Sequence, residues 1–397
     1  MSSKINRQSE QVQAQLSEIT SISQETFSGI QIIKSFTNED NSVKAFFNSC
    51  KEYTRKQIKL VKIEAVFIPL IITLIGLSTI LTIYVGGLEV FAKRISAGNI
   101  AEFIIYVNML AWPVASIGWV TSLIQRASAS QERINEFLNI EPRIVNYNND
   151  KTIINGDLSF KDISLTYRDT KIKALDKISF EVKEGSTLGI FGKTGSGKST
   201  IANIICRILD LDSGNILFGK TPIKKLNLNN LRSSIGYIPQ DGYLFSGTIK
   251  ENIAFSKDLI DENQIILSAK KADILDEINQ FPDGFNTIVG ERGVQLSGGQ
   301  RQRLAIARAF YKDPDIYIFD DCLSAVDANK EKEILKNLHN ETKNKTTIII
   351  SHRISTFQNA DKIIVLKEGI LIDSGKHEEL ISREGFYKEI HLSQSKI

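Results

Sequence analysis

The sequence predicts two parts of different fold class: an all-α region over residues 1–145 and an α/β domain over residues 157–397, joined by a linker at 146–156. Three observations support this division. Two long stretches without charge lie in the first third of the chain. After Asn155, short apolar segments alternate with helical ones, which is typical of α/β domains. A glycine-rich loop lies between one predicted strand and the helix that follows it.

The uncharged stretches predict two membrane-spanning helices. No charged residue occurs between Ala65 and Leu88, or between Phe103 and Gln125. About 20 apolar residues cross a hydrocarbon core of about 30 Å, so we expect spans at about 63–88 and 101–125. Two helices buried in a large soluble core are the alternative, but soluble helices rarely run this long without a charge.

The charges that flank the spans predict their orientation. The loop between them holds only Glu89, Lys93 and Arg94, whereas a basic cluster precedes the first span: Lys51, Arg55, Lys56, Lys59 and Lys62. Because basic flanks stay on the cytoplasmic side, we expect a multi-pass protein of the plasma or inner membrane with its C-terminal domain in the cytoplasm. Residues 1–60 are then a helical excursion into the cytoplasm, with a turn-rich break at 35–41.

Composition excludes some classes of function. A net charge of +3 is too small to indicate a nucleic-acid partner. The three cysteines, Cys50, Cys206 and Cys322, are far apart and odd in number, which suits a reducing compartment and indicates neither a disulfide framework nor a metal site.

The glycine-rich loop predicts a site for ATP and Mg²⁺. It has the pattern G-x4-G-K-S and follows the apolar segment Leu188–Phe191. Backbone N–H groups of small residues can surround phosphate oxygens, and the helix N-terminus adds partial positive charge. Lys198 is expected to reach the β- and γ-phosphates and Ser199 to ligate Mg²⁺. The loop residues are Gly192, Lys193, Thr194, Gly195, Ser196, Gly197, Lys198, Ser199 and Thr200.

Two further motifs follow along the chain. The apolar run Ile316–Phe319 ends in Asp320 and Asp321, which predicts a buried strand that delivers Asp320 to Mg²⁺. Between this run and the loop lies Leu296 followed by Ser297, Gly298, Gly299 and Gln300. Ser and glycines at a helix start indicate a second anion-binding N-terminus, although a plain glycine turn capping a helix has the same composition.

Together these motifs resemble the ATP-binding-cassette (ABC) superfamily, and specifically its exporter half-transporters of the multidrug and lipid type. The matching motifs span residues 160–380 in the family's order. The resemblance implies that Tyr167 stacks on adenine, that Gln240 touches Mg²⁺ and the coupling helices, and that His352 contacts the γ-phosphate. It also implies an ABC ATPase fold with a helical subdomain, preceded by two spans of the six-helix exporter fold.

Other segments resemble exporter motifs without carrying the site themselves. Leu244–Ile249 is similar to the continuation of the Gln240 loop, Gly290–Gly293 to an exporter-specific segment, and Ser324–Asp327 to the loop that crosses to the partner chain. Phe27–Phe36 resembles the exporters' second cytoplasmic loop, which implies a coupling helix near 36–41.

The resemblance implies a mechanism in which ATP lies between Lys198 of one chain and Ser297 of another. The expected partner is therefore a second ABC half-transporter, and closure of the pair over Mg-ATP would move the attached helices. Both spans lack charge, which favours a small hydrophobic or amphipathic substrate. A soluble ATPase of the superfamily and an importer ATPase are disfavoured, because both usually lack membrane helices on the ATPase chain.

Asp321 departs from the family pattern, which has Glu after the metal-binding Asp to polarise the attacking water. Asp is shorter by one methylene, and a misplacement of about 1 Å can cost on the order of 100-fold in rate. The resemblance therefore implies a slow, degenerate site in a heterodimer, or a largely non-hydrolytic regulatory half. In the alternative, the loop shifts and Asp321 still acts in catalysis with His352 and Gln240.

The number of spans also departs from the family. The exporters have six per chain, and the two predicted here match the fifth and sixth. The sequence is therefore expected to be an N-terminally truncated form, a fragment or the product of a misplaced start.

Overall fold

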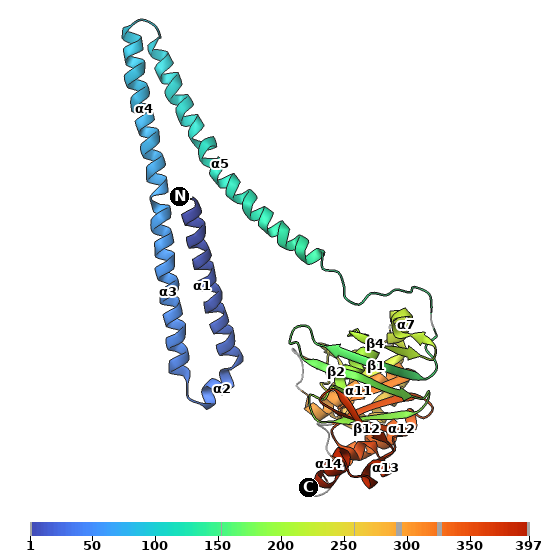
Figure 1. The fold of residues 1–397 in the computed structure, drawn as a ribbon. Helices are drawn as coiled ribbons and strands as arrows, with labels where there is room; N and C mark the ends of the chain where they lie inside the picture. The colour runs from blue at the N-terminus through green and yellow to red at the C-terminus, as the bar shows by residue number, and fades with distance from the viewer. Residues whose placement is uncertain (1, 152, 258, 291–295, 324–327, 395–397) are drawn as a thin grey trace. The chain divides into compact units, whose positions relative to one another are not determined.

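The computed structural model describes residues 2–394 apart from 152, 258, 291–295 and 324–327 (Figure 1). The predicted order, an all-α region followed by an α/β domain, is confirmed. The chain divides into two compact units, residues 1–140 and 141–397.

The segment expected to be a linker at 146–156 belongs to the second unit. Asn227 Nδ2 donates to the carbonyl of Asn148 at 2.8 Å, and the Leu228 N–H donates to Asn146 Oδ1 at 2.9 Å. These bonds join the segment to the start of helix α7 (Leu228–Ser233). An Asn-rich composition predicts a loop but does not show which distant backbone the amides bind.

The first unit consists of two helical hairpins (Figure 1). Helix α1 runs beside α3, with a short α2 between them, and α4 runs beside α5. One polar contact between the first pair joins Gln15 Nε2 to Ser49 Oγ at 2.9 Å. The helices are α1 Ser2–Ser28, α2 Ile30–Ser35, α3 Glu39–Ala65, α4 Phe67–Phe91 and α5 Ala97–Leu138.

The short helix lies before the range expected for the coupling helix. It covers Ile30–Ser35, and α3 already begins at Glu39, within the expected 36–41. Thr37 has a left-handed backbone, with a φ of 52°, which ends the helical geometry between the two elements.

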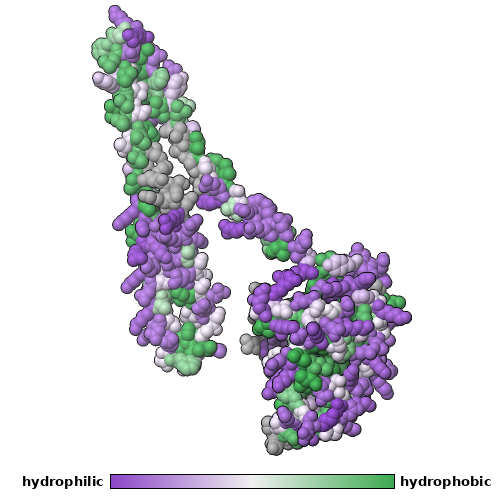
Figure 2. Space-filling model, viewed as in Figure 1, coloured by the Kyte–Doolittle hydropathy of each residue, from purple (hydrophilic) through white to green (hydrophobic). Residues whose placement is uncertain are grey.

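Apolar side chains concentrate on α4 and the first part of α5, whereas α1 and α3 are mostly polar on their surface (Figure 2). Among the described residues, one helical segment, Ile72–Phe91, is long and apolar enough to cross a membrane. The apolar start of α5, Ala97–Leu110, is shorter. The span expected at 101–125 includes side chains outside the described set, so it stays a prediction.

The second unit is built on a six-stranded sheet in the order β12-β11-β3-β10-β9-β6. All neighbours are parallel except β12, which is antiparallel to β11. β9 is buried along its whole length, as expected for a parallel strand covered on both faces. The strands are β3 Thr187–Gly192, β6 Ile235–Ile238, β9 Ile316–Asp320, β10 Thr346–Ser351, β11 Lys362–Lys367 and β12 Ile370–Gly375.

A second, antiparallel sheet has the order β2-β1-β4-β5, and a short β7-β8 pair forms a third. The core has two apolar clusters, and β3 contributes to both, because Ile190 lies in one and Phe191 in the other. The strands are β1 Leu158–Thr166, β2 Lys173–Val182, β4 Ser213–Phe218, β5 Thr221–Pro222, β7 Gly247–Thr248 and β8 Ile288–Val289.

Helices of the second unit include an insertion between β6 and β9 that contains α8–α11. The helices are α6 Lys198–Ile205, α7 Leu228–Ser233, α8 Ile249–Ile253, α9 Glu262–Lys271, α10 Leu275–Gln280, α11 Gly298–Lys312, α12 Ala328–Glu341, α13 His377–Ser382 and α14 Phe386–Gln394. Short 3₁₀ turns are η1 Ile223–Lys225, η2 Gly284–Asn286 and η3 Ile354–Phe357.

The loop from β3 to α6 turns on two glycines with left-handed backbones. Gly195 has a φ of 82° and Gly197 a φ of 94°. A Cβ at Gly197 would lie 2.5 Å from the Ala174 carbonyl oxygen and 2.8 Å from a Leu175 methyl carbon, whereas a Cβ at Gly195 would meet nothing within 4 Å. Position 197 is therefore closed to a side chain by contact as well as by conformation.

This difference predicts unequal effects of the same substitution. Gly195→Ala should cost about 1–2 kcal/mol of stability, because it adds only the strain of a left-handed residue. Gly197→Ala should cost a further 1–3 kcal/mol or so, because the loop must also move away from Ala174. Denaturant unfolding of the two variants beside the wild type measures the difference. Equal losses at both positions would contradict the packing argument.

Candidate functional site

Parallel pairing brings the predicted site residues to one edge of the six-stranded sheet. Ile350 of β10 lies opposite Asp320 of β9, and Ser351 lies opposite Phe191 of β3. The loop after β3, the carboxylates at the end of β9 and His352 after β10 therefore lie at the same level of the sheet. The carboxyl ends of parallel strands are where α/β folds place their ligand sites.

Lys198 begins α6 and is folded against its own loop. Its ammonium donates to the carbonyls of Gly192 at 2.7 Å and Lys193 at 2.9 Å. The side chain is buried, and burial lowers the pKa of Lys198, an effect that the nearby carboxylates of Asp321 and Asp320 oppose. The loop thus places a cation beside two carboxylates and beside the N-terminus of a helix.

Ser199 and Asp320 form the part of the site that fits a metal ion. The Ser199 hydroxyl donates to Asp320 Oδ1 at 3.0 Å, and Tyr237 donates its hydroxyl proton to Oδ2 at 3.3 Å. Asp320 is buried, and burial raises its pKa, against the hydrogen bonds from Ser199 and Tyr237. A hydroxyl and a carboxylate are hard oxygen ligands of the kind Mg²⁺ takes together with substrate phosphates.

Among the described residues, no group of three or more His, Cys, Asp or Glu side chains could hold a metal by itself. A two-ligand protein site is consistent with an ion whose remaining ligands are waters and phosphate oxygens. Gln240, expected to touch Mg²⁺, follows β6 at the same edge, and its main-chain carbonyl accepts from Gln302 Nε2 at 3.2 Å.

Asp321 and His352 form a second pair on the same edge. Nδ1 of His352 lies 3.0 and 2.9 Å from the two carboxylate oxygens of Asp321. The Asp321 backbone is left-handed, with a φ of 50°, and its N–H donates to the Ile350 carbonyl at 2.8 Å. Asp and Asn tolerate this conformation better than longer side chains do, so the backbone gives a structural reason for Asp at this position.

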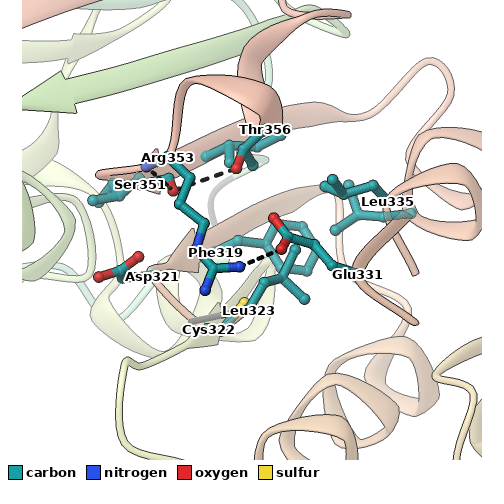
Figure 3. Close-up of a pocket in the computed structure, with 12 residues that line it drawn as sticks. Phe319, Asp321, Cys322, Leu323, Glu331, Leu335, Ser351, Arg353 and Thr356 are labelled. Carbon is teal, nitrogen blue, oxygen red and sulfur yellow. Dashed lines mark hydrogen bonds and ion pairs between the residues drawn. The ribbon is translucent and has the colours of Figure 1, made fainter. Parts of the chain in front are cut away.

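A small pocket lies beside Asp321, and its other side carries an ion pair (Figure 3). Arg353 bonds to Glu331 of α12 there, and the Arg353 N–H donates to Ser351 Oγ at 3.0 Å. Leu323 and Leu335 complete an apolar wall. The residues on both sides of His352 are therefore held by neighbours other than the phosphate loop.

Tyr167, predicted to stack on adenine, follows β1 and lies next to the phosphate loop. Its hydroxyl is 3.1 Å from Thr200 Oγ1 of α6. The structure thus brings together Tyr167 and the loop, as well as the two carboxylates and His352. Sequence reasoning gave no role to Tyr237, although it lies only three residues before Gln240, in the strand β6 that leads to it.

The Ser297–Gln300 motif forms a separate helix start. Ser297 caps α11 and accepts from the Gln300 N–H at 3.2 Å, while the Ser297 N–H donates to Gln300 Oε1 at 2.9 Å, which is a reciprocal capping box. Within the described part of the chain, no hydrogen bond joins this helix start to the phosphate loop. Gly298 and Gly299 form the first turn of α11, and N–H groups in the first turn of a helix have no acceptor within the helix, which suits an anion.

Glu277 of α10 supports this helix start and was not found from sequence. It accepts from Gln300 Nε2 at 3.0 Å and from Arg303 Nη2 at 2.9 Å, and it pairs with Lys330. Burial by itself would raise the pKa of Glu277, but hydrogen bonds from Lys330, Gln300 and Arg303 outweigh it and lower the pKa to about 2. No motif spacing marks Glu277, since the contacts come from helix packing.

Two of the exporter-like segments cannot be placed. Ser324–Asp327 and the Glu291–Gly293 part of Gly290–Gly293 lie outside the described residues.

Comparison with protein families and known proteins then shows what this arrangement belongs to. The family described as "ABC transporter transmembrane region" matches residues 1–114, and that described as "ABC transporter" matches residues 175–324. The probable multidrug resistance ABC transporter ATP-binding/permease protein YheI of Bacillus subtilis is 38% identical over 371 residues, which cover 93% of this chain and 63% of YheI. The chain thus spans less than two thirds of that relative.

Two further comparisons agree. The ATP-dependent lipid A-core flippase of Desulfotalea psychrophila is 36% identical over 388 residues, covering 97% of this chain and 68% of the flippase. A solved structure described as a bacterial Atm1-family ABC exporter with ATP bound has a TM-score of 0.86 at 28% identity and covers 99% of this chain and 69% of its own. The chain therefore belongs to the ABC transporter family, with a transmembrane helical region followed by an ABC ATPase domain.

Proposed function

We propose that this chain is the ATP-binding and ATP-hydrolysing subunit of an ABC exporter. The observation that carries the proposal is the hydrogen bond from Ser199 to the buried Asp320, beside an ammonium from Lys198. Such a pair supplies two oxygen ligands to Mg²⁺, and Lys198 can transfer its hydrogen bonds from the loop carbonyls to phosphate oxygens. Phosphoryl transfer needs this kind of positioning and charge neutralisation more than covalent chemistry.

The separation of the two anion sites supports a site shared between chains. Lys198 and the Ser297 helix start belong to different parts of the ATPase domain, and no hydrogen bond joins them in the described residues. Two chains in head-to-tail contact would place the α11 N-terminus of one over the phosphate loop of the other. The proposed partner is a second ABC half-transporter, and a chain of different sequence is favoured because of Asp321.

Export of a hydrophobic or amphipathic substrate is the proposed outcome of the ATP cycle. The named relatives are a multidrug resistance protein and a lipid A-core flippase, so both names point to apolar or amphipathic cargo. The apolar surface of α4 fits a membrane location (Figure 2). The basic cluster before this helix supports a cytoplasmic ATPase domain.

A second candidate function is a degenerate, largely non-hydrolytic half that binds ATP and regulates its partner. Asp321 favours it, because its carboxylate is one methylene shorter than Glu and both oxygens already face Nδ1 of His352. A carboxylate held by His352 is poorly placed to polarise a water as well. The intact Ser297–Gln300 motif could then complete the active site of the partner.

Removal of the Lys198 ammonium tests ATP binding. Lys198→Ala should weaken Mg-ATP binding at least 10-fold or so, because the loop loses the cation that reaches the β- and γ-phosphates. Binding of a fluorescent ATP analogue to the purified chain in detergent measures this. Lys220→Ala is the matched control, since Lys220 is an exposed lysine in the β4–β5 turn. Equal binding by wild type and Lys198→Ala would refute the assigned site.

Exchange of the Asp321 side chain distinguishes the two functions. If the site is degenerate, Asp321→Glu should raise ATP turnover by an order of magnitude or more, since the carboxylate regains about 1 Å of reach. Asp321→Asn keeps a residue that tolerates the left-handed backbone and should leave the slow rate nearly unchanged. Turnover of the purified chain measures both. Fast wild-type turnover that Asp321→Asn abolishes would reject the degenerate site.

A further inference from the structure

The C-terminal helix α14 lies against the catalytic edge of the sheet. Its Tyr387 is buried and packs edge-on against Phe191 of β3, with ring centroids 5.1 Å apart. The ring of Phe386 lies 5.6 Å from the Lys193 ammonium of the phosphate loop and 6.0 Å from that of Lys367. The start of α14 is therefore anchored to the strand that carries the phosphate loop.

The last described residue of α14, Gln394, bonds to the backbone around His352. Its Nε2 donates to the His352 carbonyl at 2.8 Å, and its Oε1 accepts from the Ile354 N–H at 3.0 Å. One side-chain amide thus bridges the main chain on both sides of Arg353. The donor and acceptor ends of the amide match a carbonyl and an N–H, so the orientation of the amide follows from its partners.

The bond with Gln394 satisfies the Ile354 N–H, a donor at the start of a helix that the preceding residue does not cap. Ile354 begins η3 (Ile354–Phe357), and the N-cap residue Arg353 provides no side-chain cap to it. The first N–H groups of a helix need an external acceptor. Gln394 supplies one from 40 residues away in the chain, as a cap from another helix.

We propose that Gln394 is a positioning residue for His352, so that α14 sets the distance between the histidine and the γ-phosphate. This inference rests on the proposed function, in which His352 contacts that phosphate. The His352 side chain itself faces Asp321, while its carbonyl is held by Gln394, so the main chain is fixed on one side and the imidazole is available on the other. Without Gln394, the His352 carbonyl and the Ile354 N–H lose their bonds to α14, while the side-chain contacts of His352 with Asp321 and of Arg353 with Glu331 remain.

The expected effect is specific to nucleotides that carry a γ-phosphate. Gln394→Met keeps the side-chain length but removes both hydrogen bonds. It should weaken ATP binding by about 5-fold, comparable to the loss of a helix cap, and should change ADP binding less than about 2-fold. His352→Ala should lower the ATP-to-ADP affinity ratio in the same way. In the His352→Ala background, Gln394→Met should have no further effect.

The experiment is titration of the whole 397-residue chain in detergent with Mg-ATP and with Mg-ADP, for wild type, both single variants and the double variant. Ser393→Ala is the matched control, because Ser393 is the exposed neighbour in α14 and its hydroxyl donates to the Ile390 carbonyl of its own helix. It should leave both affinities unchanged. Hydrogen exchange of the Ile354 amide in Gln394→Met should be faster than in wild type.

The outcomes separate the inference from the proposed function. A selective, non-additive loss of ATP affinity supports the positioning role. Unchanged ATP affinity in Gln394→Met, or equal weakening of ATP and ADP, overturns it while leaving the proposed function intact. If wild type binds neither nucleotide, the proposed function itself fails, and the inference fails with it.

Discussion

The parallel register of β3, β10 and β9 is the constraint on which the rest of the site depends. Because Ile350 pairs with Asp320 and Ser351 with Phe191, three segments far apart in sequence leave the sheet at one level. The hydrogen bond between Ser199 and Asp320 then joins α6, the first helix of the domain, to the end of β9. A shift of one strand by a single residue would turn Asp320 toward the opposite face and remove its partner.

Charge balance explains how so many polar groups can be buried at this edge. Burial lowers the pKa of Lys198 and raises that of Asp320, so each group alone would be driven toward its neutral form. Each instead lies near groups of opposite charge or hydrogen-bond donors, which restore part of the lost solvation. A bound Mg²⁺ and a polyphosphate would enter a site whose charges already compensate each other, and would replace the internal partners with their own.

Side chains outside the sequence motifs also hold the site residues in place. Glu277 fixes the start of α11 through Gln300 and Arg303, Glu331 holds Arg353, and Gln394 bonds to the main chain next to His352. These contacts come from α10, α12 and α14. Each of these helices lies at a different distance along the chain from the residues that it contacts. The supporting side chains fix the orientation of the site residues, and the site residues themselves would contact a nucleotide.

Sequence alone determined the class of the protein, because the phosphate loop, the Ser-Gly-Gly helix start and the strand that ends in Asp320 depend on short-range chemistry that residue types display directly. The apolar runs likewise predicted helices where α4 and α5 lie, and helical periodicity predicted those of residues 1–60. Only the tertiary structure decided that Asn146 and Asn148 belong to the ATPase unit, that the short helix lies at Ile30–Ser35, and that Glu277, Tyr237 and Gln394 support the site. The reason is physical: a polar side chain carries no mark of its distant partner, and only the packing of helices and sheets brings the donor to the acceptor.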